Sequence, residues 1–382
     1  MLTFNHTCIG YSHLQSGKPC QDVSYAETSD RMSIAIVSDG HGGAIHSRSD
    51  VGAQLAIFAA QGVIEDHPLS DWENPDRRQA LFKEIVNTWT VLTIDHYYDN
   101  LTEQAIAQLP LFPDVEQSIR NITTLYGCTL IAACVHPEGW FAFQIGDGKC
   151  VTINRVSREA SEKDNSTQSY TTLYNSTQSL TSEPIPTDDR CFLNMTTSLC
   201  DPNAATEFRF CGGNKDTIPV AIFLGSDGID NSWGSTELLH DFYLEVFKHC
   251  YSREIILQEL QEVLPQLSEK GSHDDMSIAA LVQEDALLES ITAIYQHQIA
   301  ECERIKKRQE TRLIGCQESI ALKQSELAER PDDEFLQRDL SNLQNQVAQL
   351  NKQLSRTTHR LIRLQQQSSK DNIKTCSRID DN

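Results

Sequence analysis

Several features that define common protein classes are missing from this sequence. Its 382 residues contain no run of eighteen apolar residues, so neither a transmembrane helix nor a membrane partner is expected. The first residues, MLTFNH, carry no basic segment and no apolar core, so a signal peptide is not expected. Together these two absences predict a cytoplasmic protein.

Paired cysteine motifs are also missing. The chain has 12 cysteines, but no Cys-x-x-Cys pair occurs, which argues against a structural zinc site. Cys128, Cys134 and Cys150 lie in apolar runs with the character of strands. We expect them to be buried, reduced thiols that act as small apolar side chains.

Positive charge is scarce over most of the chain. The first 288 residues hold 17 Lys and Arg against 40 Asp and Glu, whereas the remainder holds 15 against 14. An acidic surface of this kind repels nucleic-acid phosphates, so no DNA or RNA partner is expected for the first part. The same negative excess favours a cation site.

Short apolar runs alternate with longer amphipathic ones in this acidic part. The short runs predict strands at residues 33–38, 128–135, 140–145, 150–154, 220–225 and 277–282. Apolar spacing near 3.6 residues predicts helices at 44–63, 77–98, 236–247 and 253–267. Strands in hairpins with long helices between them favour a layered α+β domain over a doubly wound parallel sheet.

The composition divides the chain into parts. The predicted main domain covers residues 1–287 and is interrupted by a polar insertion at about 157–205, in which the sequence NSTQS occurs twice. This insertion is either a loop without a function or an interaction segment. Residues 369–382 are predicted to be a disordered tail.

Residues 288–368 have the pattern of two helices separated by a break at Pro331. The second helix repeats apolar residues in alternating steps of four and three, with one polar interruption at Thr357, a pattern typical of coiled coils. The apolar positions are Leu336, Leu340, Leu343, Val347, Leu350, Leu354, Leu361 and Leu364. Two helices joined by a short break predict an antiparallel hairpin. Its apolar seam pairs either within the chain, or with a second copy or another partner.

Aspartates recur at the ends of the predicted strands. The first is Asp39, which ends an apolar run and is followed by Gly40-His41-Gly42-Gly43. The glycines allow a tight turn, so that the Gly40 carbonyl can act as a ligand beside the Asp39 carboxylate. The ordinary pKa range of histidine suits His41 to proton transfer near neutral pH.

Three further aspartates follow the same plan. Asp227 and Asp147 each follow an apolar run and precede glycine, and Asp274 stands just before another such run. A single Asp-Gly after a strand is more often a turn than a ligand, but four such ends in one domain indicate a shared site. Oxygen ligands of this kind suit Mg²⁺ or Mn²⁺.

The ordered motifs DGHGG at 39–43, GCT at 127–129, GDG at 146–148, SDG at 226–228 and DDMS at 274–277 resemble those of the metal-dependent protein phosphatases. This is the PPM family of type 2C Ser/Thr phosphatases, and the similarity covers about residues 10–282. A subset of bacterial members looks similar around Cys20-Gln21-Asp22. The helical tail lies outside the resemblance.

The resemblance implies a fold and a site. The expected fold is a four-layer αββα sandwich, with two central antiparallel sheets flanked by helices and followed by the helical hairpin. The expected site holds two Mg²⁺ or Mn²⁺ ions, with Asp39 bridging them and the Gly40 carbonyl as a further ligand. Asp227 and Asp274 would hold one metal, and Asp147 would help bind a third ion.

The resemblance also implies an activity, the hydrolysis of phosphoserine or phosphothreonine in a phosphorylated protein. A metal-activated water would attack phosphorus, and His41 would protonate the leaving oxygen. No phosphoenzyme is implied.

Two positions depart from the family pattern. Gln21 stands where the family often has a metal-binding Glu, so Asp22 would bind metal directly or through water. Gly17 stands where the family often has a phosphate-binding Arg, and Lys18 or His13 would replace it. These departures leave open a second hypothesis, a catalytically weak module that binds phosphoproteins on a coiled-coil scaffold. A metal-dependent nuclease or nucleotide hydrolase fits the ions but not the acidic surface.

Overall fold

The computed structural model describes residues 1–67, 72–102, 114–155, 180–191 and 195–379. Within these residues, ten strands form two five-stranded sheets in which every pairing is antiparallel. The chain divides into two compact units, and the second contains all residues from Leu288 onward. No helix among the described residues is long and apolar enough to cross a membrane.

The two sheets are built from strands that are far apart in sequence. The first has the order β1 (Leu2–Cys8), β10 (Met276–Val282), β9 (Ala221–Gly225), β6 (Lys149–Ile153), β7 (Thr181–Ser182). The second has the order β2 (Asp22–Thr28), β3 (Ser33–Asp39), β4 (Leu130–His136), β5 (Gly139–Ile145), β8 (Arg209–Asn214).

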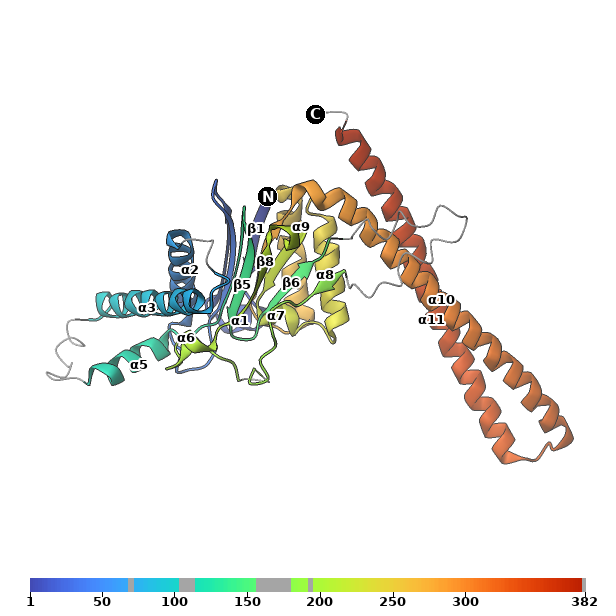
Figure 1. The fold of residues 1–382 in the computed structure, drawn as a ribbon. Helices are drawn as coiled ribbons and strands as arrows, with labels where there is room; N and C mark the ends of the chain where they lie inside the picture. The colour runs from blue at the N-terminus through green and yellow to red at the C-terminus, as the bar shows by residue number, and fades with distance from the viewer. Residues whose placement is uncertain (68–71, 103–113, 156–179, 192–194, 380–382) are drawn as a thin grey trace. The chain divides into compact units, whose positions relative to one another are not determined.

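Helices cover the outer face of each sheet (Figure 1). One side carries α2 (Ser49–Asp66), α3 (Pro75–Asp99) and α5 (Val115–Leu125), and the other carries α8 (Thr236–Lys248) and α9 (Arg253–Lys270). Shorter helices are α1 (Tyr11–Ser16), α6 (Ala204–Glu207) and α7 (Asp227–Asp230). The predicted four-layer αββα sandwich is therefore confirmed.

Strand alternation explains how three apolar layers form at once. Successive side chains of a strand point to opposite faces, so a strand between two layers is apolar at every position. On β9, Ile222 and Leu224 belong to the core between the sheets. Phe223 points the other way and packs 5.3 Å from the ring of Tyr243 on α8. The six strands predicted from sequence are buried runs of this kind.

The structure corrects several predicted boundaries. Helix α2 begins at Ser49 rather than at residue 44, because the residues after Asp39 form a loop at the end of β3. Strands β1, β2 and β8 were not predicted, since they lie at sheet edges and contain many polar residues. Both NSTQS repeats of the predicted insertion lie outside the described residues. Its later part is not all loop, because β7 pairs with β6.

The second unit contains the long helix α10 (Glu284–Glu329), which begins in the first unit, and α11 (Glu334–Ile379). Lys323 Nζ contacts Asp339 Oδ2 at 2.6 Å, and one heptad further along both helices Cys316 Sγ lies 3.9 Å from Gln346 Oε1. These pairs define an antiparallel register. Helix α11 continues to Ile379, so residues 369–379 of the predicted disordered tail are helical.

Candidate active site

A cavity of about 840 Å³ lies at the ends of the central strands. Seven residues that were predicted to bind metal or phosphate, or to take part in catalysis, line it: His13, Asp39, Gly40, His41, Asp147, Asp227 and Asp274. They come from five separate segments of the first unit. The fold therefore brings together the aspartates that the sequence places up to 235 residues apart.

Strand pairing places Asp39 at this cavity. Asp39 lies directly opposite Asp22 in the β2–β3 ladder. Its backbone is held from the other side by Thr129, whose hydroxyl accepts from the Asp39 amide at 3.1 Å and whose amide donates to the Asp39 carbonyl at 2.8 Å. Gly40 follows, and a Cβ there would lie 2.6 Å from the Ser49 carbonyl oxygen. Only glycine fits this close approach of two backbones.

Asp227 and Asp274 reach the cavity from the other sheet. Asp227 begins the short helix α7 directly after β9, and its Oδ2 accepts from Asn231 Nδ2 at 3.0 Å. Asp274 precedes β10 and is exposed to solvent. The residue before it, His273, has a φ of 65°, a conformation that is uncommon outside glycine.

Asp275 was not assigned a role from the sequence, yet it organises the amino-terminal side of the cavity. Its two carboxylate oxygens accept from the amide of Gly10 at 2.5 Å, the amide of Gln21 at 2.6 Å and Nδ1 of His13 at 2.9 Å. Asp275 thus holds His13 and the segment leading to Asp22.

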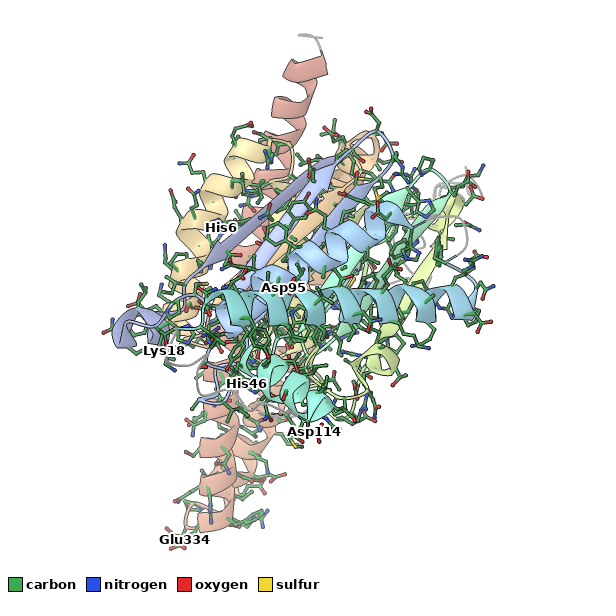
Figure 2. The ribbon with its side chains drawn as sticks, turned by 90° about the vertical axis from the view of Figure 1, so that its left-hand side faces the viewer. His6, Lys18, His46, Asp95, Asp114 and Glu334 are labelled. Carbon is green, nitrogen blue, oxygen red and sulfur yellow. The ribbon has the colours of Figure 1, made fainter. Side chains whose placement is uncertain are left out.

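The two residues predicted to bind phosphate have different positions. His13 is buried and lines the cavity. Lys18 is exposed beyond the end of α1 and does not line the cavity (Figure 2). Among the described residues lining the cavity there is no Arg or Lys.

A second histidine, His46, was also missed because nothing in its sequence spacing distinguishes it. Its ring lies edge-on to His41, with 4.9 Å between the centroids, and its Nδ1 lies 2.6 Å from the Thr124 carbonyl oxygen, to which it can donate. Burial, together with the neighbouring His46, lowers the pKa of His41 to about 4. The ring is therefore mostly neutral near pH 7, unlike a histidine of ordinary pKa, and the small protonated fraction is a strong proton donor.

The carboxylates at the cavity repel one another. Burial first, and then the charges of Asp22 and Asp227, raise the pKa of Asp39 well above its usual range. Burial likewise raises the pKa of Asp22, with the charge of Asp275 adding to the effect. Burial raises the pKa of Asp227 to about 6. Bringing acidic groups together in this way is unfavourable unless positive charge is added.

The donor set fits divalent cations of the Mg²⁺ type. Asp22 Oδ2 is buried without a hydrogen-bond partner, and a bound cation would satisfy it directly or through water. Within the described part of the chain, no three His, Cys, Asp or Glu side chains form a ready-made cage for a metal. Mg²⁺ does not require such a cage, because it keeps several waters and binds proteins through one or two carboxylates.

The sequence model for protein phosphatase 2C matches residues 9–265 of this chain. The chain belongs to the protein phosphatase 2C family. The predicted family is thereby confirmed, and with it the enzyme class, protein serine/threonine phosphatase. The matched residues include every predicted metal-binding and catalytic position except Asp274.

Solved structures of phosphatases are similar to the chain at low identity. Serine/threonine phosphatase Stp1 from Staphylococcus aureus has 14% identity and a TM-score of 0.45, covering 74% of this chain and 96% of its own. The Mycobacterium tuberculosis phosphatase PstP/Ppp has 13% identity and a TM-score of 0.42, with coverage of 74% and 98%. No curated protein sequence matches significantly. The family assignment depends on the family model alone.

Proposed function

We propose that this protein phosphatase 2C member hydrolyses phosphoserine and phosphothreonine in proteins at a two-metal centre, with a third ion beside Asp147. The observation that carries the proposal is the gathering of Asp39, Asp227 and Asp274 around one cavity, with the buried Asp22 behind Asp39. Bound Mg²⁺ or Mn²⁺ would supply an acidified water and neutralise charge on the phosphoryl oxygens.

Each residue has a defined part in this proposal. Asp39 and the Gly40 carbonyl hold the ions from the end of β3, and Asp227 and Asp274 hold them from the opposite sheet. Asp22 contributes directly or through water. The His41 ring, at the cavity wall, protonates the leaving serine or threonine oxygen.

Phosphate recognition in this chain relies on histidine and on the cations. The cavity lining contains His13, fixed by Asp275, in place of an arginine. His13 Nδ1 is engaged with the carboxylate, so only its Nε2 remains for a phosphoryl oxygen. Lys18 is set aside in this proposal, because it does not line the cavity.

The decisive test is Asp39→Asn assayed with a phosphopeptide and with p-nitrophenyl phosphate in the presence of Mn²⁺. Loss of a carboxylate charge that would hold the cations is expected to lower kcat by roughly 10³-fold or more. The matched control is Asp30→Asn, which changes an exposed aspartate in the β2–β3 turn at the other end of β3. It should retain full activity.

The same assay separates the alternative of a catalytically weak binding module. Metal-dependent phosphopeptide binding by the wild type, without release of inorganic phosphate, would favour that module. Equal turnover by wild type and Asp39→Asn would remove the two-metal proposal altogether. The predicted self-association through the hairpin is a separate hypothesis, which light scattering of the full chain would test.

A further inference from the structure

Several hydrogen bonds hold the backbone of the turn between β5 and β6 at Gly146, just before Asp147. Gly146 has a φ of 106°, and a Cβ at this position would lie 2.5 Å from Thr129 side-chain atoms, so the position requires glycine. Its amide donates to Thr197 Oγ1 at 2.9 Å. Its carbonyl oxygen accepts from Arg209 Nη2, and from Gln144 Nε2 at 3.1 Å.

The two side-chain donors to this carbonyl come from neighbouring strands. Gln144 on β5 lies directly opposite Arg209 on β8, so their side chains leave the same face of the sheet side by side. Gln144 Nε2 also donates to the Gly148 carbonyl, on the far side of Asp147. The aspartate is thus bracketed by backbone groups that are bonded to side chains.

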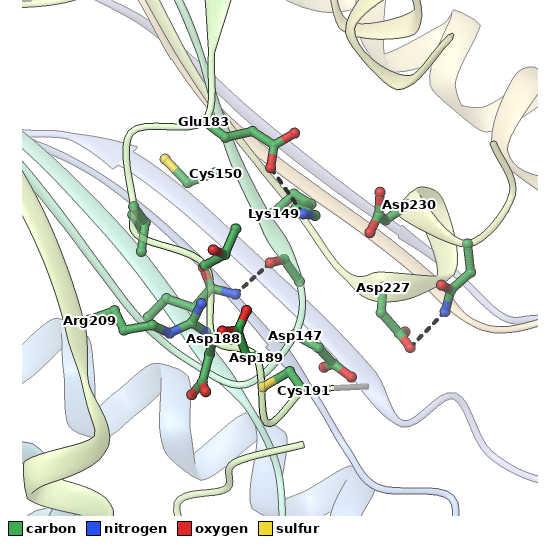
Figure 3. Close-up of a pocket in the computed structure, with 15 residues that line it drawn as sticks. Asp147, Lys149, Cys150, Glu183, Asp188, Asp189, Cys191, Arg209, Asp227 and Asp230 are labelled. Carbon is green, nitrogen blue, oxygen red and sulfur yellow. Dashed lines mark hydrogen bonds and ion pairs between the residues drawn. The ribbon is translucent and has the colours of Figure 1, made fainter. Parts of the chain in front are cut away.

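Arg209 makes a second bond that connects the turn to another segment. Its Nη1 donates to the Pro186 carbonyl at 3.0 Å, while Cys191 Sγ lies 3.7 Å from the Gly146 carbonyl oxygen. Figure 3 shows Arg209 at the wall of a second cavity of about 390 Å³, which Asp147 also lines. A planar guanidinium can bond two carbonyls in a fixed geometry, which a lysine ammonium cannot reproduce.

We propose that Arg209 is a positioning residue that clamps the Gly146 carbonyl to the Pro186 segment and so orients Asp147 toward the catalytic cavity. Asp147 lines both cavities, together with Asp227. Thr196, the neighbour of the Thr197 that bonds the Gly146 amide, lines the catalytic cavity as well. Because Asp147 matters only if cations occupy that cavity, this inference depends on the proposed function.

The test measures Mn²⁺ binding as well as turnover. Arg209→Ala and Arg209→Lys are titrated with Mn²⁺ while the signal of free Mn²⁺ is followed by electron paramagnetic resonance. Removing groups that orient a metal ligand typically weakens metal affinity by 10–100-fold. We expect the weakest class of bound Mn²⁺ to lose affinity by about tenfold or more in both variants. The Mn²⁺ concentration for half-maximal phosphopeptide hydrolysis should rise in parallel, with little change in KM.

The matched control is Arg190→Ala. Arg190 is an exposed arginine in the segment that contains Pro186. It pairs with Asp188 and Glu207 rather than with Gly146. It should bind Mn²⁺ as the wild type does. Thermal unfolding of all variants separates loss of metal affinity from loss of fold, and Arg209→Lys serves if Arg209→Ala does not fold.

Wild-type Mn²⁺ affinity in Arg209→Ala would refute the proposed positioning role and leave Arg209 with a structural role in the edge strand β8. Wild-type affinity in Arg209→Lys would show that charge alone suffices, which also contradicts a bidentate clamp. A wild type that binds Mn²⁺ without hydrolysing phosphopeptides would refute the proposed function, while the binding curves would still decide the role of Arg209. A wild type that binds no Mn²⁺ would overturn both.

Discussion

The sandwich and the helical hairpin bury their residues in different ways. In the sandwich, the central strands are buried on both faces, and acidic side chains such as Asp22 and Asp275 are buried as well. In the hairpin, α11 buries a single seam that includes Leu336, Leu350 and Leu364, and its other faces are exposed. The fold of the sandwich therefore depends on contacts between segments that are distant in sequence. The apolar face of each hairpin helix, in contrast, is determined by the spacing of apolar residues within that helix.

The largest expected difference between the two regions comes from removing an aromatic ring. Phe223 is fully buried on β9 and contacts the rings of Phe4 and Tyr243. Phe223→Ala should lower the free energy of unfolding of the sandwich by about 3–5 kcal/mol, because it leaves a cavity between sheet and helices. Urea unfolding followed by tryptophan fluorescence would measure this loss.

Phe335→Ala is the matched control in the hairpin, because Phe335 is 74% exposed. It should change stability by less than about 0.5 kcal/mol. A loss of several kcal/mol in the free energy of unfolding of this control would show that another group covers the Phe335 ring in solution. Phe335 would then not belong to the exposed surface of the hairpin.

A smaller effect is expected at the hairpin seam. Leu350 is 6% exposed, and Leu350→Ala should lower local stability by about 2–3 kcal/mol. Hydrogen exchange of the α10 and α11 amides would detect it, and turnover should remain unchanged. Leu322→Ala on the exposed surface of α10 is the control. Loss of activity in Leu350→Ala alone would show that the two regions are coupled.

This contrast also explains what could be predicted from sequence. The hairpin seam was predicted position by position, because a helical repeat is a local property. Leu340, Leu343, Val347 and Leu354 are half-buried and Leu350 is buried, while most residues between these positions are exposed. The buried central strands were predicted for the same reason. Edge strands such as β1 mix polar and apolar residues, so composition did not distinguish them from loops.

The candidate site could be predicted only in part. Asp39, Asp147 and Asp227, which line the cavity, could be singled out because each follows a buried strand and precedes glycine, and their metal-binding role stays a prediction. Asp275 and Arg209 could not be singled out, because they form their hydrogen bonds with backbone groups remote in sequence. No sequence pattern indicates which backbone carbonyl a side chain will bond in the folded protein.

The smallest expected difference separates an enclosed ion pair of the sandwich from an exposed one of the hairpin. Glu183 contacts Lys149 Nζ at 2.9 Å and His240 Nε2 at 3.2 Å. Hydrogen bonding from His240 first, and then from Lys149, lowers the pKa of Glu183 to about 2. A carboxyl whose pKa is lower in the folded than in the unfolded protein stabilises the fold above the unfolded pKa, and this contribution fades as pH falls toward the folded pKa.

Glu183→Gln should therefore be less stable than the wild type by about 1–2 kcal/mol at pH 6, after allowance for solvent screening. The deficit should shrink between pH 4.5 and pH 2, where the wild-type carboxyl becomes protonated. Glu301→Gln, which breaks the more exposed pair with Arg304 on α10, should follow the wild type across this range, because exposed pairs contribute little. Urea midpoints measured at successive pH values test both variants. A loss of stability in Glu183→Gln that stays constant with pH would mean that the shape of the Glu183 side chain, rather than its charge, stabilises the fold.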